Sequence, residues 1–288
     1  MNVKSSQIQK LYIAYFGRPA DPSGINYWLV NSPTGTTIND ISKKDLYEEF
    51  IDVESIAKIL DNYCDIVLVG DSMANVLYGM DNTHKISLET IIQHSISVRK
   101  GVKKSLLVVD MPKGSYKNPL QAKKNAKLIL KKTKCDAVKL EGGKKIIPIV
   151  KSLVKNRIPV MGHLGILPQT DTKFTFKGKK LAERNKILRD AKLLEKSGIF
   201  SIVLECVETK LSKQITKELK IPTIGIGSSV NCDGQVLVID DLIGLSKSNL
   251  KFVKKYADVN KIINLAVKKY KSEVIKKQFP NTQHSFKN

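Results

Sequence analysis

The sequence predicts an α/β protein built around a parallel sheet, most simply a (β/α)8 barrel. Short runs rich in Val, Ile and Leu lack polar alternation, which is typical of strands buried on both faces. Amphipathic helical patterns separate these runs from residue 65 onward, as expected when helices connect parallel strands. Four of the runs end at an acidic residue, namely Asp71, Asp110, Glu141 and Glu205. Because the carboxyl ends of barrel strands form the active-site face, this pattern also predicts where the chemistry lies.

We expect seven strands, over residues 65–70, 105–110, 137–141, 158–163, 201–205, 221–227 and 235–240. The helix after the first strand has Ser87 as its expected N-cap and Gly101 as its expected stop, and a later helix is expected to stop at Gly198. Closing the barrel requires an eighth strand, and the candidate that precedes residue 65 is 45–53. Acidic residues interrupt the apolar pattern of this candidate, so the first strand is atypical.

Residues 1–44 differ in character from the rest of the chain. They combine aromatic residues, including Trp28, with the turn sequence GRPADPSG, and a linker reading SPTGTTIND follows. The stretch resembles a short helical repeat of unknown function found in bacterial surface-associated proteins. We therefore expect two parts: a small helical N-terminal segment with its linker over 1–44, and a catalytic barrel over 45–288.

The composition restricts the classes of partner. The chain has 49 Lys and Arg against 27 Asp and Glu, but only five of the basic residues are Arg. A protein that reads nucleic acid relies on Arg and stacking aromatics, so we interpret the lysines as a solvated surface and expect no specific nucleic-acid partner. No apolar run approaches the roughly 18 residues of a membrane span, and no membrane association is expected. The four cysteines are widely separated, and a cytoplasmic location is the simplest expectation.

Three carboxylates at successive strand ends suit a hard divalent cation such as Mg²⁺. Asp71, Asp110 and Glu141 are these candidates. Each of them alone would more simply cap a helix or pair with a lysine, but three in succession favour a site. Ser72, which follows Asp71, is either a ligand for a substrate carboxylate or an ordinary turn residue.

Lys139 lies two residues before Glu141, so both side chains point to the same side of a strand, here the barrel interior. A lysine in that position needs a partner, which favours a role in the site. Glu205, at a later strand end, is a candidate general base, and its alternative is a helix cap or an ion pair. His163 also ends a strand and is expected either to contact a substrate or to orient a loop, as an accessory residue.

Several ordered blocks resemble the ketopantoate hydroxymethyltransferase family over residues 55–288. They read VGDSMANVLYG, VVDMPKGSY, AVKLEGG, PVMGHLGILPQ, IVLECVE and IPTIGIGSSVNCDGQVLVIDDLIGL. The resemblance implies a (β/α)8 TIM barrel of the phosphoenolpyruvate/pyruvate superfamily that assembles as a homo-oligomer, commonly a decamer. It also implies Mg²⁺ as cofactor and methylenetetrahydrofolate as co-substrate. The implied reaction transfers a hydroxymethyl group to 3-methyl-2-oxobutanoate through a Mg²⁺-stabilised enolate, in pantothenate and coenzyme A biosynthesis.

The same resemblance implies roles for individual residues. Metal ligation falls to Asp71, Asp110 and Glu141, contact with the 2-oxo acid to Asp71, Ser72, Asp110 and Lys139, and proton removal to Glu205. The block DLYEEFIDVES departs from the first strand of the family, so no residue is carried over from it. Two alternatives stay open: a related Mg²⁺-dependent barrel enzyme acting on another 2-oxo acid as an aldol-type lyase or mutase, and an inactive barrel used for assembly.

Overall fold

The computed structural model describes residues 53–171, 175–246 and 248–286. Residues 53–257 form one compact unit, and the described residues from 258 onward belong to a second. The expected boundary after residue 44 lies outside the described residues, as do residues 45–52 of the candidate first strand. Val53, the last residue of that candidate, begins helix α4 (Val53–Leu60) instead. The first strand therefore stays a prediction.

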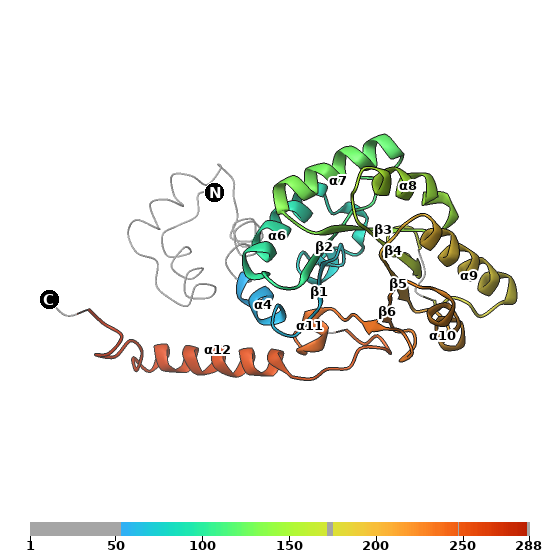
Figure 1. Cartoon of the computed structure of the whole chain (residues 1–288). Helices are drawn as coiled ribbons and strands as arrows, with labels where there is room; N and C mark the ends of the chain where they lie inside the picture. Colours follow the sequence, from blue (N-terminus) through green and yellow to red (C-terminus); the bar gives the residue numbers. More distant parts are fainter. Residues whose placement is uncertain (1–52, 172–174, 247, 287–288) are drawn as a thin grey trace, which may run out of the picture. The chain divides into compact units, whose positions relative to one another are not determined.

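The unit over 53–257 is built on seven parallel strands that pair in chain order. They are β1 (Ile66–Val69), β2 (Leu106–Asp110), β3 (Ala137–Glu141), β4 (Val160–Gly165), β5 (Ser201–Glu205), β6 (Thr223–Ile226) and β7 (Gly234–Gln235). The connecting helices are α5 (Met73–Val76), α6 (Leu88–Gly101), α7 (Pro119–Thr133), α8 (Ile147–Lys155), α9 (Leu181–Lys196), α10 (Thr209–Glu218) and α11 (Ile239–Leu242), with short 3-10 turns η1 (Thr83–Lys85) and η2 (Lys144–Ile146). Figure 1 shows α6 to α10 around the outside of the curved sheet. The predicted parallel α/β barrel-like fold is thus confirmed.

The strands separate two apolar cores. Side chains on the inner face, Val108, Ala137, Met161 and Val203, pack together inside the curved sheet. Alternate residues such as Val138 and Leu140 pack outward, in the larger core beneath the helices. All five residues of β3 are consequently buried. This explains why the strands read as continuous apolar runs, and why Lys139 and Glu141 must face the interior.

The helix ends follow local signals in the sequence. The Ser87 hydroxyl accepts the N–H of Thr90 at 3.0 Å, which confirms Ser87 as the N-cap of α6. Gly101 is the last residue of α6, and a Cβ there would lie 2.3 Å from the carbonyl oxygen of Glu54. Glycine at this position therefore lets α4 pack closely against the end of α6.

The seventh strand is shorter than the sequence predicts. Residues 235–240 read as a strand, but pairing stops after Gln235, and Ile239–Leu242 form helix α11. The physical reason is the loss of a partner, because β6 ends at Ile226 and the chain turns at Gly227, where φ is +60°. After Val236 donates to the Gly225 carbonyl at 3.0 Å, the apolar residues that follow continue without a ladder.

The second unit contributes one described helix, α12 (Val259–Ile275), in which no residue is buried. Its apolar side chains include Ile262 and Leu265, which are 62% and 58% exposed. Across the described part of the chain, no helix combines the length and apolar character needed to cross a membrane.

Candidate active site

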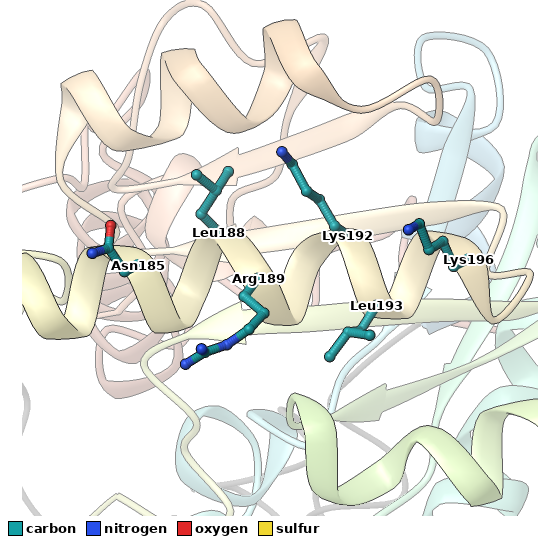
Figure 2. A pocket seen from close by; sticks show the side chains of 6 residues that line it. All are labelled: Asn185, Leu188, Arg189, Lys192, Leu193 and Lys196. Carbon is teal, nitrogen blue, oxygen red and sulfur yellow. The ribbon is translucent and has the colours of Figure 1, made fainter.

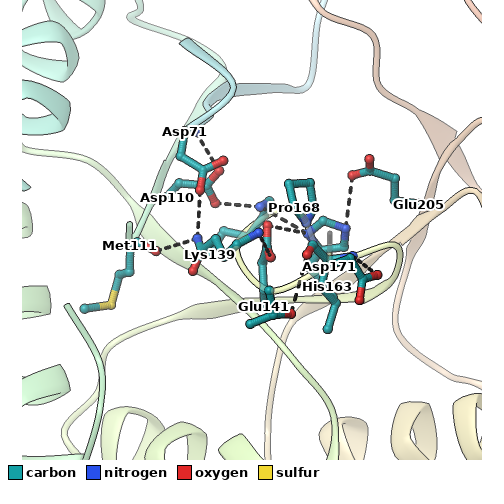
Figure 3. Close-up of polar contacts among 12 residues, drawn as sticks. Asp71, Asp110, Met111, Lys139, Glu141, His163, Pro168, Asp171 and Glu205 are labelled. Atoms are coloured by element: carbon teal, nitrogen blue, oxygen red, sulfur yellow. Dashed lines mark hydrogen bonds and ion pairs between the residues drawn. The ribbon is translucent and has the colours of Figure 1, made fainter. Parts of the chain in front are cut away.

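The strand register gathers the predicted polar residues at the carboxyl ends of β1 to β5. Asp110 pairs with Lys139 between β2 and β3, Glu141 pairs with His163 between β3 and β4, and Gly165 pairs with Glu205 between β4 and β5. Asp71 follows β1 after one glycine. Figure 3 shows these side chains in one connected network, as the strand-end pattern predicts.

Asp71, Asp110 and Lys139 form the first part of the network. The Asp71 N–H donates to Asp110 Oδ2 at 3.0 Å, and Lys139 Nζ lies 2.6 Å from Asp110 Oδ1. Burial raises the pKa of Asp71 to about 7, and the charge of Asp110 adds to the rise. Burial acts to lower the pKa of Lys139, but the charges of Asp110 and Glu141 outweigh it and raise that pKa. The ammonium group thus stays charged and offsets the repulsion between the acids.

His163 joins two further carboxylates. Its Nδ1 lies 3.4 Å from Glu141 Oε1, and its Nε2 lies 3.2 Å from Glu205 Oε2. Burial and Lys139 act to lower the pKa of His163, but the two carboxylates outweigh them and raise it to about 9. Burial likewise acts to raise the pKa of Glu141, yet the His163 contact lowers it. His163 therefore lies between Glu141 and Glu205, and the raised pKa favours its protonated form although Lys139 Nζ also lies 3.4 Å from its Nδ1.

Glu205 differs from the other acids in its access to solvent. Its side chain is 13% exposed, whereas that of Glu141 is 3% exposed. Ser72 is half-buried at the start of α5, where its hydroxyl makes no cap hydrogen bond. This leaves open both interpretations of Ser72.

Two residues in the network were missed by the sequence reasoning, Gln169 and Tyr116. The Gln169 side chain donates to Asp71 Oδ2 at 2.9 Å, and its backbone N–H donates to Glu141 Oε2 at 3.1 Å. The Tyr116 hydroxyl donates to Gln169 Oε1 at 2.6 Å. Both follow strand ends, Tyr116 after β2 and Gln169 after β4, so their place on the active-site face was readable from the sequence. Neither residue type, however, stands out as an acid or a base.

The donor set suits a hard cation in part. Counting only described residues as partners, the buried Asp110 Oδ1 accepts no aligned hydrogen bond despite its ion pair with Lys139. Mg²⁺ usually takes one or two carboxylates, with water and substrate oxygens completing its shell, and Asp71 and Asp110 can supply these. Within the described ranges, no three His, Cys, Asp or Glu side chains gather closely enough to hold a metal ion. Glu141 is instead engaged by His163 and Gln169, so the three-carboxylate ligand set stays a prediction.

A separate hollow lies on the surface of α9. It encloses about 300 Å³ and is lined by Asn185, Leu188, Arg189, Lys192, Leu193 and Lys196 (Figure 2). None of the predicted site residues borders it, and all of its lining comes from a single helix. It therefore has no part in the chemistry at the strand ends.

Several known proteins resemble this chain over most of its length. The family model described as ketopantoate hydroxymethyltransferase matches residues 52–282. A Pelagibacter ubique protein named 3-methyl-2-oxobutanoate hydroxymethyltransferase is 61% identical over 233 residues, which cover 81% of this chain and 91% of that protein. Proteins of the same name are 45% identical in Anaplasma marginale, covering 80% of this chain and 84% of that one, and 45% identical in Clostridioides difficile, covering 81% and 86%.

A solved structure supports the fold. The crystal structure of a phosphonopyruvate hydrolase superposes with a TM-score of 0.52 at 10% identity, covering 82% of this chain and 84% of that one. At that identity the likeness concerns the barrel-like architecture alone. The family match spans most of the chain and includes every residue of the network described above. The chain therefore belongs to the ketopantoate hydroxymethyltransferase family.

Proposed function

We propose that this protein transfers a hydroxymethyl group from methylenetetrahydrofolate to 3-methyl-2-oxobutanoate, forming 2-dehydropantoate, or ketopantoate. In the overall reaction the C3–H bond of the 2-oxo acid and the two C–N bonds of the folate's methylene bridge break, and a C3–CH₂OH bond forms, while the freed folate nitrogens take up the C3 proton and a proton from water. Water supplies the hydroxyl group, and tetrahydrofolate is released. The observation that carries the proposal is the buried chain of Asp71, Asp110, Lys139, Glu141 and His163, which leads to the more exposed Glu205.

Glu205 is assigned as the base that takes the C3 proton. A base must reach its substrate, and Glu205 is the more exposed of the two carboxylates that contact His163. His163 Nε2 lies 3.2 Å from Glu205 Oε2, and the second carboxylate oxygen lies outside this contact. The charge that develops on the substrate needs fixed positive groups nearby, and Lys139 and His163 supply them. Ser72 is assigned to the substrate carboxylate.

Asp71 and Asp110 are assigned as the residues that hold Mg²⁺, with Glu141 as the third member of the set. Mg²⁺ held there would supply Lewis-acid polarisation of the 2-keto group of the substrate, which would make its C3 proton easier to remove. Lys139 orients Asp110 through their 2.6 Å ion pair, and with the two acids it would also contact the 2-oxo acid. A cytoplasmic location and a homo-oligomeric, decameric assembly belong to the same proposal.

The test is exchange of the C3 proton of 3-methyl-2-oxobutanoate in D₂O, followed by NMR with and without Mg²⁺. We expect Mg²⁺-dependent exchange by the wild type, and a loss of about 10²–10⁴-fold in Glu205→Gln, the usual contribution of a general base. Glu89→Gln is the matched control, because Glu89 is an exposed glutamate on α6 that pairs with Lys132. Exchange in Glu205→Gln at the wild-type rate would remove Glu205 from the mechanism.

A second assay identifies the acceptor. Formation of ketopantoate from 3-methyl-2-oxobutanoate and methylenetetrahydrofolate is expected for the wild type. If the protein instead turned over another 2-oxo acid without the folate, the related lyase or mutase activity would replace this proposal. No exchange with any 2-oxo acid and no thermal shift with Mg²⁺ would favour the inactive assembly barrel.

A further inference from the structure

Gln169 is a buried residue that makes several hydrogen bonds to the proposed site, although the sequence did not predict it there. It is 1% exposed, although it lies in a loop outside the strands. Its Nε2 donates to Asp71 Oδ2 at 2.9 Å and to the Met111 carbonyl at 3.0 Å. Its Oε1 accepts from the Tyr116 hydroxyl at 2.6 Å, and its backbone N–H donates to Glu141 Oε2 at 3.1 Å.

These contacts fix the orientation of the amide group. Both N–H bonds of Nε2 point to acceptors, a carboxylate and a carbonyl, while Oε1 faces a hydroxyl donor. A flipped amide would set Oε1 against Asp71 and the Met111 carbonyl, leaving buried acceptors facing one another at a cost of about 1–3 kcal/mol for each unsatisfied group. The side chain therefore has one satisfied orientation, in which it donates to a carboxylate.

The turn that carries Gln169 is itself held at several points. The N–H groups of Thr170 and Asp171 both donate to the Leu167 carbonyl, at 2.9 and 2.7 Å, and the Leu167 N–H donates to Asp171 Oδ2 at 3.1 Å. On another side, His84 Nε2 lies 3.1 Å from the Pro168 carbonyl oxygen. The loop after β4 thus presents Gln169 to the site from a defined turn.

We propose that Gln169 is a positioning residue that holds the carboxylates of Asp71 and Glu141 in one fixed arrangement. The two acids follow or end different strands, and Gln169 donates a hydrogen bond to each of them. A carboxylate that must meet a cation or a substrate oxygen needs its free oxygens aimed, and outer hydrogen bonds do this. This inference rests on the function proposed above, because it assigns Gln169 to the same metal and substrate site.

The test uses Gln169→Met, which keeps the side-chain length but removes the amide. We expect Mg²⁺ affinity, measured by titration calorimetry without substrate, to fall about 10- to 100-fold, the usual effect of losing an outer hydrogen bond to a metal ligand. Gln214→Met is the matched control, since Gln214 also donates its amide to a carboxylate, that of Glu218 at 2.8 Å, but on the exposed face of α10. We expect Gln214→Met to bind Mg²⁺ as the wild type does.

Tyr116→Phe provides a second route that keeps the Gln169 amide. It should weaken Mg²⁺ binding by less than Gln169→Met does. Besides Gln169, the Tyr116 hydroxyl meets the backbone of Glu141 rather than its carboxylate, with the Glu141 N–H donating to it at 3.4 Å. The double variant should therefore bind Mg²⁺ little more weakly than Gln169→Met alone. A purely structural role would give additive losses of stability and leave the Mg²⁺ affinity of the folded protein unchanged.

The outcomes separate the two proposals. Mg²⁺ binding and proton exchange by the wild type, with unchanged affinity in Gln169→Met and Tyr116→Phe, would overturn the role of Gln169 and leave the proposed function standing. Absence of Mg²⁺ binding and exchange in the wild type would overturn the proposed function, and this inference with it. If Gln169→Met does not fold, the Mg²⁺ affinity of Tyr116→Phe decides the question. An affinity equal to that of the wild type would then overturn the inference.

Discussion

Replacing Gly165 by alanine should damage both stability and the placement of Glu205. Gly165 ends β4 with φ at +103°, a conformation that residues with a Cβ rarely adopt. A Cβ there would lie 2.0 Å from the carbonyl oxygen of Glu205, its register partner on β5. The obstacle is backbone, and the same carbonyl also accepts the Ile166 N–H at 2.9 Å, so no side-chain rotation can relieve the contact.

Two costs combine in this variant. The unfavourable φ contributes about 1–3 kcal/mol. To restore a tolerable contact, the Cβ and the oxygen must separate from 2.0 Å to at least 3.0 Å, which pulls β4 and β5 apart at this point. Losing the hydrogen bond there adds about 1 kcal/mol. We therefore expect Gly165→Ala to lower the free energy of unfolding by about 3 kcal/mol, and a 1 Å misplacement of Glu205 to slow C3-proton exchange by about 10²-fold.

Gly114→Ala separates these costs. Gly114 also has a positive φ, +86°, but the nearest atom to its Cβ would be Lys117 Cε at 3.9 Å, the flexible end of a side chain. This control should lose only the φ contribution, about 1–3 kcal/mol, and keep the wild-type exchange rate. Urea unfolding and the exchange assay measure the two quantities. Equal behaviour of Gly165→Ala and Gly114→Ala in both would refute the claim that this strand contact sets the position of Glu205.

Two further predictions concern buried charges. Lys139→Met should lower the free energy of unfolding in urea by about 3–5 kcal/mol, because it leaves Asp110 buried without its 2.6 Å partner; a loss below 1 kcal/mol would contradict the ion pair. Burial lowers the pKa of His94 from 6.5 to about 4, so its contribution to stability is fully present above pH 6.5 and is lost as the pH falls toward 4. Between pH 7.5 and 5 the stability of the wild type relative to His94→Gln should therefore fall by about 2 kcal/mol in urea unfolding, because the titrations of Asp71 and His163 are common to both proteins and cancel in the difference.

The strands and the acids at their ends were predictable because both depend on short stretches of sequence. A strand buried on both faces is apolar throughout, and β3 and β5 have the predicted bounds. The interior placement of Lys139 and Glu141 followed from alternation along one strand, and the structure agrees.

The predictions that failed concern residues whose structure depends on partners distant in the sequence. Residues 235–240 have the composition of a strand, but β6 ends too early to pair with all of them. Gln169 was not predicted as a site residue because its role comes from contacts with Asp71, 98 positions away, and with Tyr116, 53 positions away. An amide in a loop carries no local signal of such contacts, whereas a lysine in an apolar strand does.

The balance of charge in the network gives a physical reason for a divalent cation. When ionised, Asp71, Asp110, Glu141 and Glu205 carry four negative charges, and Lys139 and His163 carry two positive ones. Two negative charges are left over in a site where Asp110 and His163 are each 2% exposed. Burying such an excess is costly unless a cation or a proton offsets it. Burial raises the pKa of Asp71 to about 7 and the charge of Asp110 adds to the rise, so a proton on Asp71 is one way to offset the excess. A cation of charge +2 beside Asp71 and Asp110 would be the other. Gln169 is a neutral donor, so it can orient these acids without changing the net charge of the network. An arginine or lysine in its place would add a positive charge.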